Sequence, residues 1–180
     1  MVKVYGVTGM PLAGKTTVAD ILEDKGYQKV DMGDVVREEM EQKNLPPEKT
    51  GEFVNKQRDK HGMDAIARLT VPYAQDCFEE EQDVVITGMR SLDEKEKFEE
   101  EFDYGIDVIA IWAPDKVRKK RRKARGRPED EKGQSFTERD YRELKNGVGD
   151  LVAKSDYLIK NYSIDKQKLK EKVEEILEDD

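Results

Sequence analysis

Short runs of β-branched and aromatic residues alternate along the chain with longer stretches whose apolar residues recur at helical spacing. The short runs predict five strands, at residues 2–7, 27–32, 83–87, 105–112 and 156–159. The run at 105–112 is continuously apolar, which is typical of a parallel strand covered on both faces. Because strands and helices alternate throughout, we expect one α/β domain over residues 1–180, with a parallel sheet between two helical layers.

The periodic stretches predict helices between these strands. One is expected from residue 18 to Gly26, others at 35–43 and 63–81, and Pro72 is expected to kink or divide the last of these. Downstream, helices are predicted from 115, over 136–153 and at the end of the chain. Residues 44–62 are polar and weakly periodic, so we expect a mobile insertion on the substrate side.

Composition and charge narrow the class of protein. The chain of 180 residues is 36% hydrophobic and 41% charged, and its net charge of −8 argues against a general nucleic-acid binder, although a local basic patch can override that sign. Cys77 is the only cysteine, which excludes an internal disulfide and a cysteine-cluster metal site. There is no run of 18 apolar residues and the chain opens on a strand, so we expect a cytoplasmic protein without membrane contact. The oligomeric state stays open.

The first strand leads directly into a phosphate-binding loop of the form Gly-x-x-x-x-Gly-Lys-Thr. Glycines let successive backbone N–H groups point at an anion, and the following helix presents its positive N-terminal end to the same anion. Lys15 is expected to reach the β- and γ-phosphates of ATP, and the Thr16 hydroxyl to bind Mg²⁺. The expected ATP-binding residues of the loop are Gly9, Met10, Pro11, Leu12, Ala13, Gly14, Lys15, Thr16 and Thr17.

Arginines elsewhere in the chain supply candidate sites for a second substrate. Arg37 follows the second predicted strand with Asp34, and Arg90 follows the third, so these side chains are expected at the carboxyl edge of the sheet. A planar guanidinium there can hold a phosphate through two hydrogen bonds. Two further groups flank a Gly- and Pro-containing linker and predict a lid over about residues 116–142, namely Arg118, Arg121, Arg122, Arg125 and Arg127 on one arm, and Arg139 and Arg142 on the other.

In these motifs the chain resembles the nucleoside-monophosphate kinase group, and within it the archaeal adenylate-kinase-related ATP-binding proteins, similar in plan to adenylate kinase and dephospho-coenzyme A kinase. The resemblance is carried by residues 9–17, 33–37, 84–91, 125–127, 136–144 and 155–161. It implies a P-loop NTPase three-layer sandwich, a five-stranded parallel sheet in the order 2-3-1-4-5 and a helical lid. It also implies ATP as phosphoryl donor with Mg²⁺ as cofactor.

The resemblance further implies a role for individual residues. Arg37 and Arg90 match the arginines that grip the acceptor's phosphate. Arg121 resembles the lid arginine that stacks on adenine, and Arg125 the one that meets the phosphates. Arg139 resembles the arginine on the far arm of the lid. Arg127 is also expected to be a lid residue. The catalytic set implied in this way is Lys15, Asp34, Arg90 and Arg125.

One residue departs from the family pattern. Adenylate kinases carry an aspartate directly before the glycine after strand three, where this chain has Thr87. Asp31 or Asp34 is the alternative support for the metal, and either is a candidate base for an acceptor hydroxyl, as in dephospho-coenzyme A kinases. Of the two, we expect Asp34 to take part in catalysis and in acceptor binding.

Two functions follow from these residues. The first is an ATP-dependent kinase that transfers the γ-phosphoryl group to a nucleotide-like small molecule, either a nucleoside monophosphate or dephospho-coenzyme A. The alternative is a regulatory or assembly ATPase of the same fold that acts on a protein or RNA partner. The basic run at 116–127 has three interpretations, a lid helix, a solvated face or an RNA-binding patch, and the last of these would suit such a partner. Arg58 is expected either to assist the acceptor or only to solvate an exposed helix.

Overall fold

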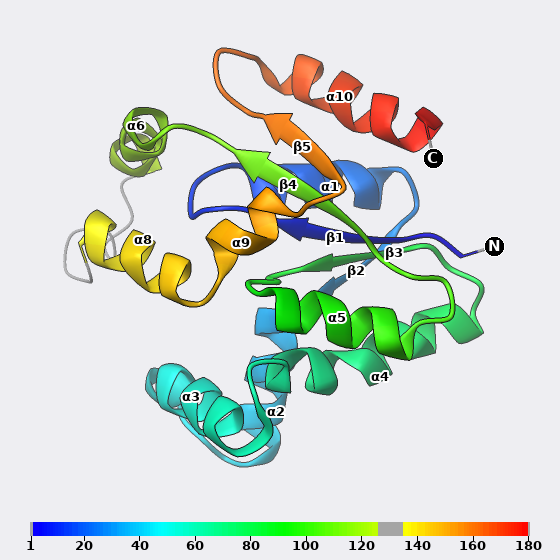
Figure 1. Cartoon of the computed structure of the whole chain (residues 1–180), viewed down its shortest axis with the longest axis vertical. Coiled ribbons are helices and arrows are strands. Elements are labelled where there is room, and N and C mark those ends of the chain that lie inside the picture. Colours follow the sequence, from blue (N-terminus) through cyan, green and yellow to red (C-terminus); the bar gives the residue numbers. More distant parts are fainter. Residues whose placement is uncertain (1, 126–134, 180) are drawn as a thin grey trace.

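The computed structural model describes residues 2–125 and 135–179 and contains a five-stranded, fully parallel sheet in the order β2-β3-β1-β4-β5. The fold class and strand order expected from the sequence are therefore confirmed (Figure 1). The strands are β1 (Val4–Thr8), β2 (Gln28–Asp31), β3 (Val84–Thr87), β4 (Asp107–Trp112) and β5 (Tyr157–Lys160). Their inward residues are almost all aliphatic, and β1, β3 and most of β4 are buried.

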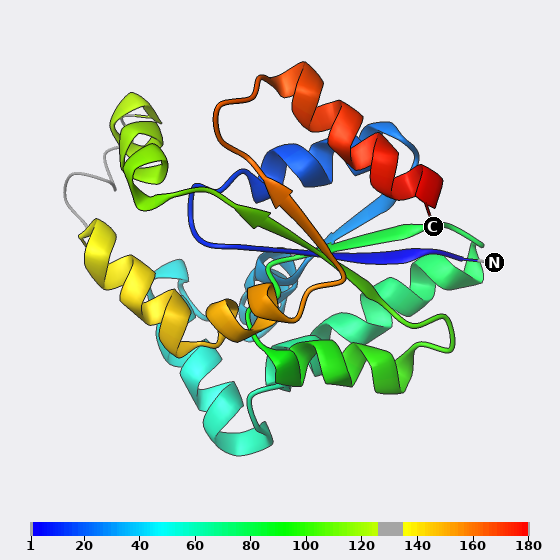
Figure 2. The same ribbon diagram turned by 45° about the horizontal axis from the view of Figure 1, so that its top comes forward.

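Helices cover both faces of this sheet (Figures 1 and 2). One face is covered by α1 (Lys15–Asp24) and α10 (Lys166–Asp179), whose apolar residues share a core with β1, β4 and β5. The other core lies beneath α2 (Met32–Gln42), α4 (Ala65–Glu79), α5 (Leu92–Glu101) and α9 (Val148–Ala153). None of the helices in the described part of the chain is both long enough and apolar enough to cross a membrane.

The strand register brings the functional segments to one edge of the sheet. Thr87 at the end of β3 pairs with Val7 of β1 on one side and with Asp31 of β2 on the other. The loops that leave these three strands therefore open side by side at the carboxyl edge, where ligands of parallel sheets bind. Beyond the same edge of β4 and β5 lie α6 (Asp115–Arg125) and α8 (Phe136–Lys145) (Figure 1).

The segment at residues 44–62 has more regular structure than the sequence pattern predicts. Residues expected as a polar insertion form a short 3₁₀ helix, η1 (Pro47–Lys49), and a full helix, α3 (Thr50–His61). Phe53 is the buried residue of α3 and packs it against the core. The apolar residues of α3 are the adjacent pair Phe53 and Val54, which give almost no 3.6-residue periodicity, and this is why the pattern did not predict this helix. Helix α4 continues through Pro72 and is not divided there.

The helix predicted over 136–153 is instead two helices. The first, α8, ends at Lys145, and α9 begins after Gly147, whose φ of 101° lies in the left-handed region. A Cβ on Gly147 would meet the carbonyl oxygen of Arg90 at 3.3 Å, so the break places the chain closely against the end of β3. A glycine inside a helical pattern is the signal that predicts such a break.

Candidate functional site

The phosphate-binding loop joins β1 to α1, and two of its glycines cannot be replaced without a clash. Gly9 has φ 140°, and a Cβ there would lie 2.3 Å from the carbonyl oxygen of Ile111 on β4. Gly14 has φ 113°, and its Cβ would lie 2.1 Å from the Asn161 side-chain nitrogen. The loop is therefore packed against β4 and the end of β5, and only glycine allows both the conformation and the close approach.

Lys15, the first residue of α1, folds back over this loop. Its Nζ donates to the carbonyl oxygen of Gly9 at 2.7 Å and to that of Met10 at 3.1 Å. Burial lowers the pKa of the Lys15 ammonium to about 8, with nearby arginines adding to the shift and Glu143 opposing it. The lysine is thus a cation held in a partly desolvated site, where an anion would stabilise its charge.

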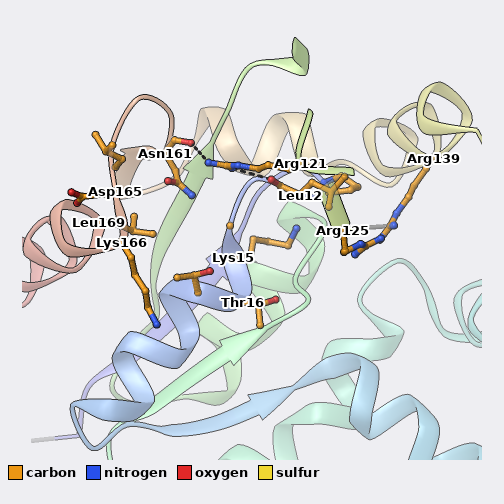
Figure 3. A pocket seen from close by; sticks show the side chains of 14 residues that line it. Leu12, Lys15, Thr16, Arg121, Arg125, Arg139, Asn161, Asp165, Lys166 and Leu169 are labelled. Atoms are coloured by element: carbon orange, nitrogen blue, oxygen red, sulfur yellow. Dashed lines mark hydrogen bonds between the residues drawn. The ribbon is translucent and has the colours of Figure 1, made fainter. Parts of the chain in front are cut away.

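A cavity of about 660 Å³ opens above the loop (Figure 3). Most of the predicted ATP-binding loop lines it, together with the predicted lid residues Arg121, Arg125 and Arg139. Figure 3 shows the guanidinium ends of Arg125, from α6, and Arg139, from α8, approaching each other at one side of the cavity. Arg127 lies outside the described residues. The far wall comes from the chain after β5 and from α10, with Asn161, Ile164, Asp165, Lys166 and Leu169.

Arg121 is fixed against the backbone of the loop. Its Nη1 donates to the carbonyl oxygens of Leu12 at 3.0 Å and Ala13 at 2.9 Å, and its Nη2 donates to that of Asn161 at 2.8 Å (Figure 3). Asn161 in turn donates from its side chain to Ala13 at 2.7 Å. From the sequence, Arg121 was expected to stack on adenine, and these hydrogen bonds to the loop were not predicted. Asn161 was indicated only by the motif at 155–161.

Arg118 connects the loop to both helices beyond the edge of the sheet. It is 2% exposed, and its guanidinium pairs with Asp140 on α8 and Asp115 on its own helix. Its Nη1 also donates to the carbonyl oxygen of Pro11 at 3.1 Å, and the ring of Phe136 lies 4.9 Å from the guanidinium carbon. This arginine therefore ties α6, α8 and the phosphate loop into one unit.

A second cavity, of about 390 Å³, lies at the same edge of the sheet beside the ends of β2 and β3. The predicted acceptor residues Arg37 and Arg90 both line it, and so does Arg58 from α3. Its remaining lining comes from Asp31, Met32, Gly33, Val36, Thr50, Val54, Ile66, Gly88 and Glu94. Three arginines beside apolar side chains in one cavity suit a ligand that carries an anionic group on a less polar body.

The two candidate carboxylates have different surroundings. Asp31 caps α2, accepting from the Asp34 backbone N–H at 2.9 Å, and its other oxygen accepts from the Thr87 hydroxyl at 2.6 Å. Asp34 accepts from Nε of Arg37 at 3.1 Å and pairs with the same guanidinium. Asp31 lines the second cavity, whereas Asp34 is not among the residues that line it. Thr87 does not line the cavity itself, but its hydroxyl is hydrogen-bonded to Asp31, which does.

Sequence reasoning missed two buried carboxylates at the second cavity, Glu94 in its wall and Glu143 beside Arg90. Glu94 accepts from the backbone N–H of Arg90 at 2.6 Å and lies 3.4 Å from Arg58, while burial raises the pKa of its carboxyl group. Glu143 of α8 lies 3.2 Å from Nε of Arg90. The pattern Ser91-x-x-Glu94 predicts a helix start and could have revealed Glu94. No local pattern marks Glu143, whose partner is 53 positions away in the chain.

Comparison with known proteins defines the class to which this fold and site belong. A family model described as an AAA domain matches residues 6–145. The structure is similar to the Thermus thermophilus protein TT1252, at 18% identity and a TM-score of 0.64 over 99% of this chain and 97% of that one. It is also similar to shikimate kinase from Bacteroides thetaiotaomicron, at 15% identity and a TM-score of 0.60 over 98% of both chains. The chain therefore has a P-loop, kinase-like α/β fold.

Sequence relatives identify the family more narrowly. The chain is 39% identical over 178 residues to a UPF0200 protein of Thermococcus onnurineus. This match covers 96% of this chain and 95% of the relative. It is 36% identical over 178 residues to a UPF0200 protein of Pyrobaculum aerophilum, with 98% of each chain covered. The protein belongs to the UPF0200 family. Its narrower resemblance to the adenylate-kinase-related group stays a prediction.

Proposed function

We propose that this protein is an ATP-dependent kinase that transfers the γ-phosphoryl group to a phosphorylated, nucleotide-like small molecule, either a nucleoside monophosphate or dephospho-coenzyme A. The observation that carries the proposal is a pair of cavities at one edge of the sheet. One is lined by Lys15 and Thr16 of the phosphate loop, and the other by Arg37, Arg58 and Arg90. A kinase needs such a donor site beside an anion-binding acceptor site.

In the donor cavity, the triphosphate of ATP would accept hydrogen bonds from the loop N–H groups and from the Lys15 ammonium. The carbonyl oxygens of Gly9 and Met10, which now accept from Lys15, would give way to phosphate oxygens. Arg125 and Arg139 would add positive charge from α6 and α8. Arg121 keeps the loop in shape through its three carbonyl contacts.

The residues at this site fit Mg²⁺ bound in the way that kinases bind it. Among the described residues no group of three or more acidic, histidine or cysteine side chains forms a cage for a metal ion. The exposed Thr16 hydroxyl would therefore hold the ion together with phosphate oxygens and water. When bound, Mg²⁺ neutralises charge on the phosphates.

In the acceptor cavity, Arg37 and Arg90 would hold the acceptor's phosphate. A carboxylate would orient the attacking hydroxyl or accept its proton. Asp34 is the residue predicted for this role, and the position of Asp31 in the cavity wall supports Asp31 as its alternative. Catalysis then depends on positioning and on charge stabilisation by Lys15 and the lid arginines.

The assignment of the two cavities can be tested through ATP binding alone. Lys15→Ala should weaken binding of Mg²⁺-ATP by at least about tenfold, because the ammonium that faces the phosphates is lost. Arg37→Ala, the matched control in the second cavity, should leave ATP affinity within about twofold. Equal losses in the two variants, measured by titration calorimetry, would contradict separate donor and acceptor sites.

A further inference from the structure

Glu143 is a buried carboxylate that the proposed reaction does not use. Its side chain is 8% exposed, and one of its oxygens lies 3.2 Å from Nε of Arg90. The other oxygen lies 4.0 Å from Nη2 of Arg142, whose side chain is 57% exposed. Burying a carboxylate is costly unless a cation compensates it, and of these two arginines Arg90 is the closer to Glu143.

The position of Glu143 relates it to both cavities. Arg90 lines the second cavity. The charge of Glu143 also partly opposes the lowering of the Lys15 pKa by burial, and Lys15 lines the first cavity. Its negative charge therefore acts on the lysine of the donor site and on an arginine of the acceptor site at once. The phosphates of the proposed substrates would supply negative charge to the same two cations.

The helix that presents Glu143 is fixed at both ends. One turn earlier, Asp140 pairs with Arg118, which donates to the phosphate loop. After the last turn, the side chain of Asn146 accepts from Nη1 of Arg58 at 3.0 Å. Helix α8 thus connects the phosphate loop to α3, and Glu143 lies between these two attachments.

We propose that Glu143 is an internal competitor for Arg90, which the anionic group of the acceptor must displace. A phosphate dianion can engage the guanidinium through two charge-assisted hydrogen bonds, whereas the closest approach of Glu143 to Arg90 is an ion pair at Nε, 3.2 Å long. The displaced carboxylate has a second cation in Arg142, toward solvent. A neutral acceptor has no charge to exchange for that of Glu143, so this residue selects for acceptors that carry phosphate.

The proposal rests on the proposed function only in calling the second cavity an acceptor site, and its test is anion binding without turnover. Inorganic phosphate is the probe, and calorimetry measures its affinity. All variants carry Lys15→Ala, so that phosphate bound by the donor loop does not contribute. In this background Glu143→Gln should bind phosphate about tenfold more tightly, because the competing charge is removed with little change of shape.

Arg90→Ala supplies the decisive control. When it is combined with Glu143→Gln, the gain in phosphate affinity should vanish, since the two residues act through one contact. Glu96→Gln removes an exposed charge from α5 and should leave phosphate binding unchanged. Glu143→Asp, which keeps the charge but shortens the side chain, should give a smaller gain and serves if the glutamine variant does not fold.

Two results would overturn this role for Glu143. Phosphate affinity that is unchanged or weaker in both Glu143 variants would show that the carboxylate does not compete. A gain that persists without Arg90 would show that it acts elsewhere. Neither result bears on whether the protein transfers phosphoryl groups, which is decided by product analysis, so the two proposals can fail independently.

Discussion

The Lys15 ammonium has a pKa lowered to about 8, chiefly by burial, so the proposed binding of ATP should depend on pH. The phosphates bind the protonated lysine, and its protonated fraction in the free protein falls as pH rises through 8. Affinity for ATP should therefore fall about tenfold between pH 7 and pH 9, with a proton taken up on binding at the upper end. Calorimetry in buffers of different ionisation enthalpy measures both quantities.

Lys15→Met is the control for this pH dependence. The variant lacks the titrating group, so its weaker ATP affinity should be nearly constant across the same range. A wild-type affinity that does not change between pH 7 and pH 9 would mean that the lysine keeps an ordinary pKa in the folded protein.

At the same scale, the buried pair of Arg118 and Asp140 holds α8 to the phosphate loop. Arg118→Met should lower the free energy of unfolding by about 3 kcal/mol, because it leaves Asp140 buried without its cation. Arg118→Met with Asp140→Leu should cost less than the sum of the single variants. Chemical denaturation of the four proteins measures this coupling, and strictly additive losses would contradict it.

At the scale of elements, the break between α8 and α9 decides how the end of β3 is covered. Gly147→Ala should destabilise the protein by about 1–2 kcal/mol, since alanine is strained at φ 101° and its Cβ would press on Arg90 and Ser91. Gly149→Ala is the matched control, because Gly149 is inside α9 and its Cβ would meet only Leu144, at 3.4 Å. Thermal unfolding should show the control neutral or stabilised. Equal losses would show that the left-handed conformation is not required.

The elements also show what the sequence could and could not predict. The sheet was predictable because most of its strands are short apolar runs, and the loop because its chemistry fixes its residues. The helix α3 was not, since the adjacent residues Phe53 and Val54 are its only contacts with the core and show no helical period. The contacts of Arg118 and Glu143 join residues far apart in the chain, and no local pattern contains them. Arginines could thus be assigned to a site by their position after a strand, but their partners could not.

At the scale of the whole molecule, two cavities share one sheet edge, and α8 contributes Arg139 to the first and places Glu143 beside Arg90 of the second. The proposed donor residues of the phosphate loop line the first cavity, and the proposed acceptor arginines Arg37 and Arg90 line the second. In the proposed kinase, such an arrangement would serve transfer between two bound molecules better than hydrolysis, because the acceptor and the lid would exclude water.

The most direct test of this account is a phosphoryl-transfer screen read by mass spectrometry. The purified protein is incubated with Mg²⁺-ATP and a panel of nucleoside monophosphates, their deoxy forms and dephospho-coenzyme A. The account predicts one or more newly phosphorylated products that are absent with Lys15→Ala and reduced with Arg90→Ala. ADP formed without any phosphorylated acceptor would contradict the kinase assignment and would favour an ATPase that acts on a macromolecular partner.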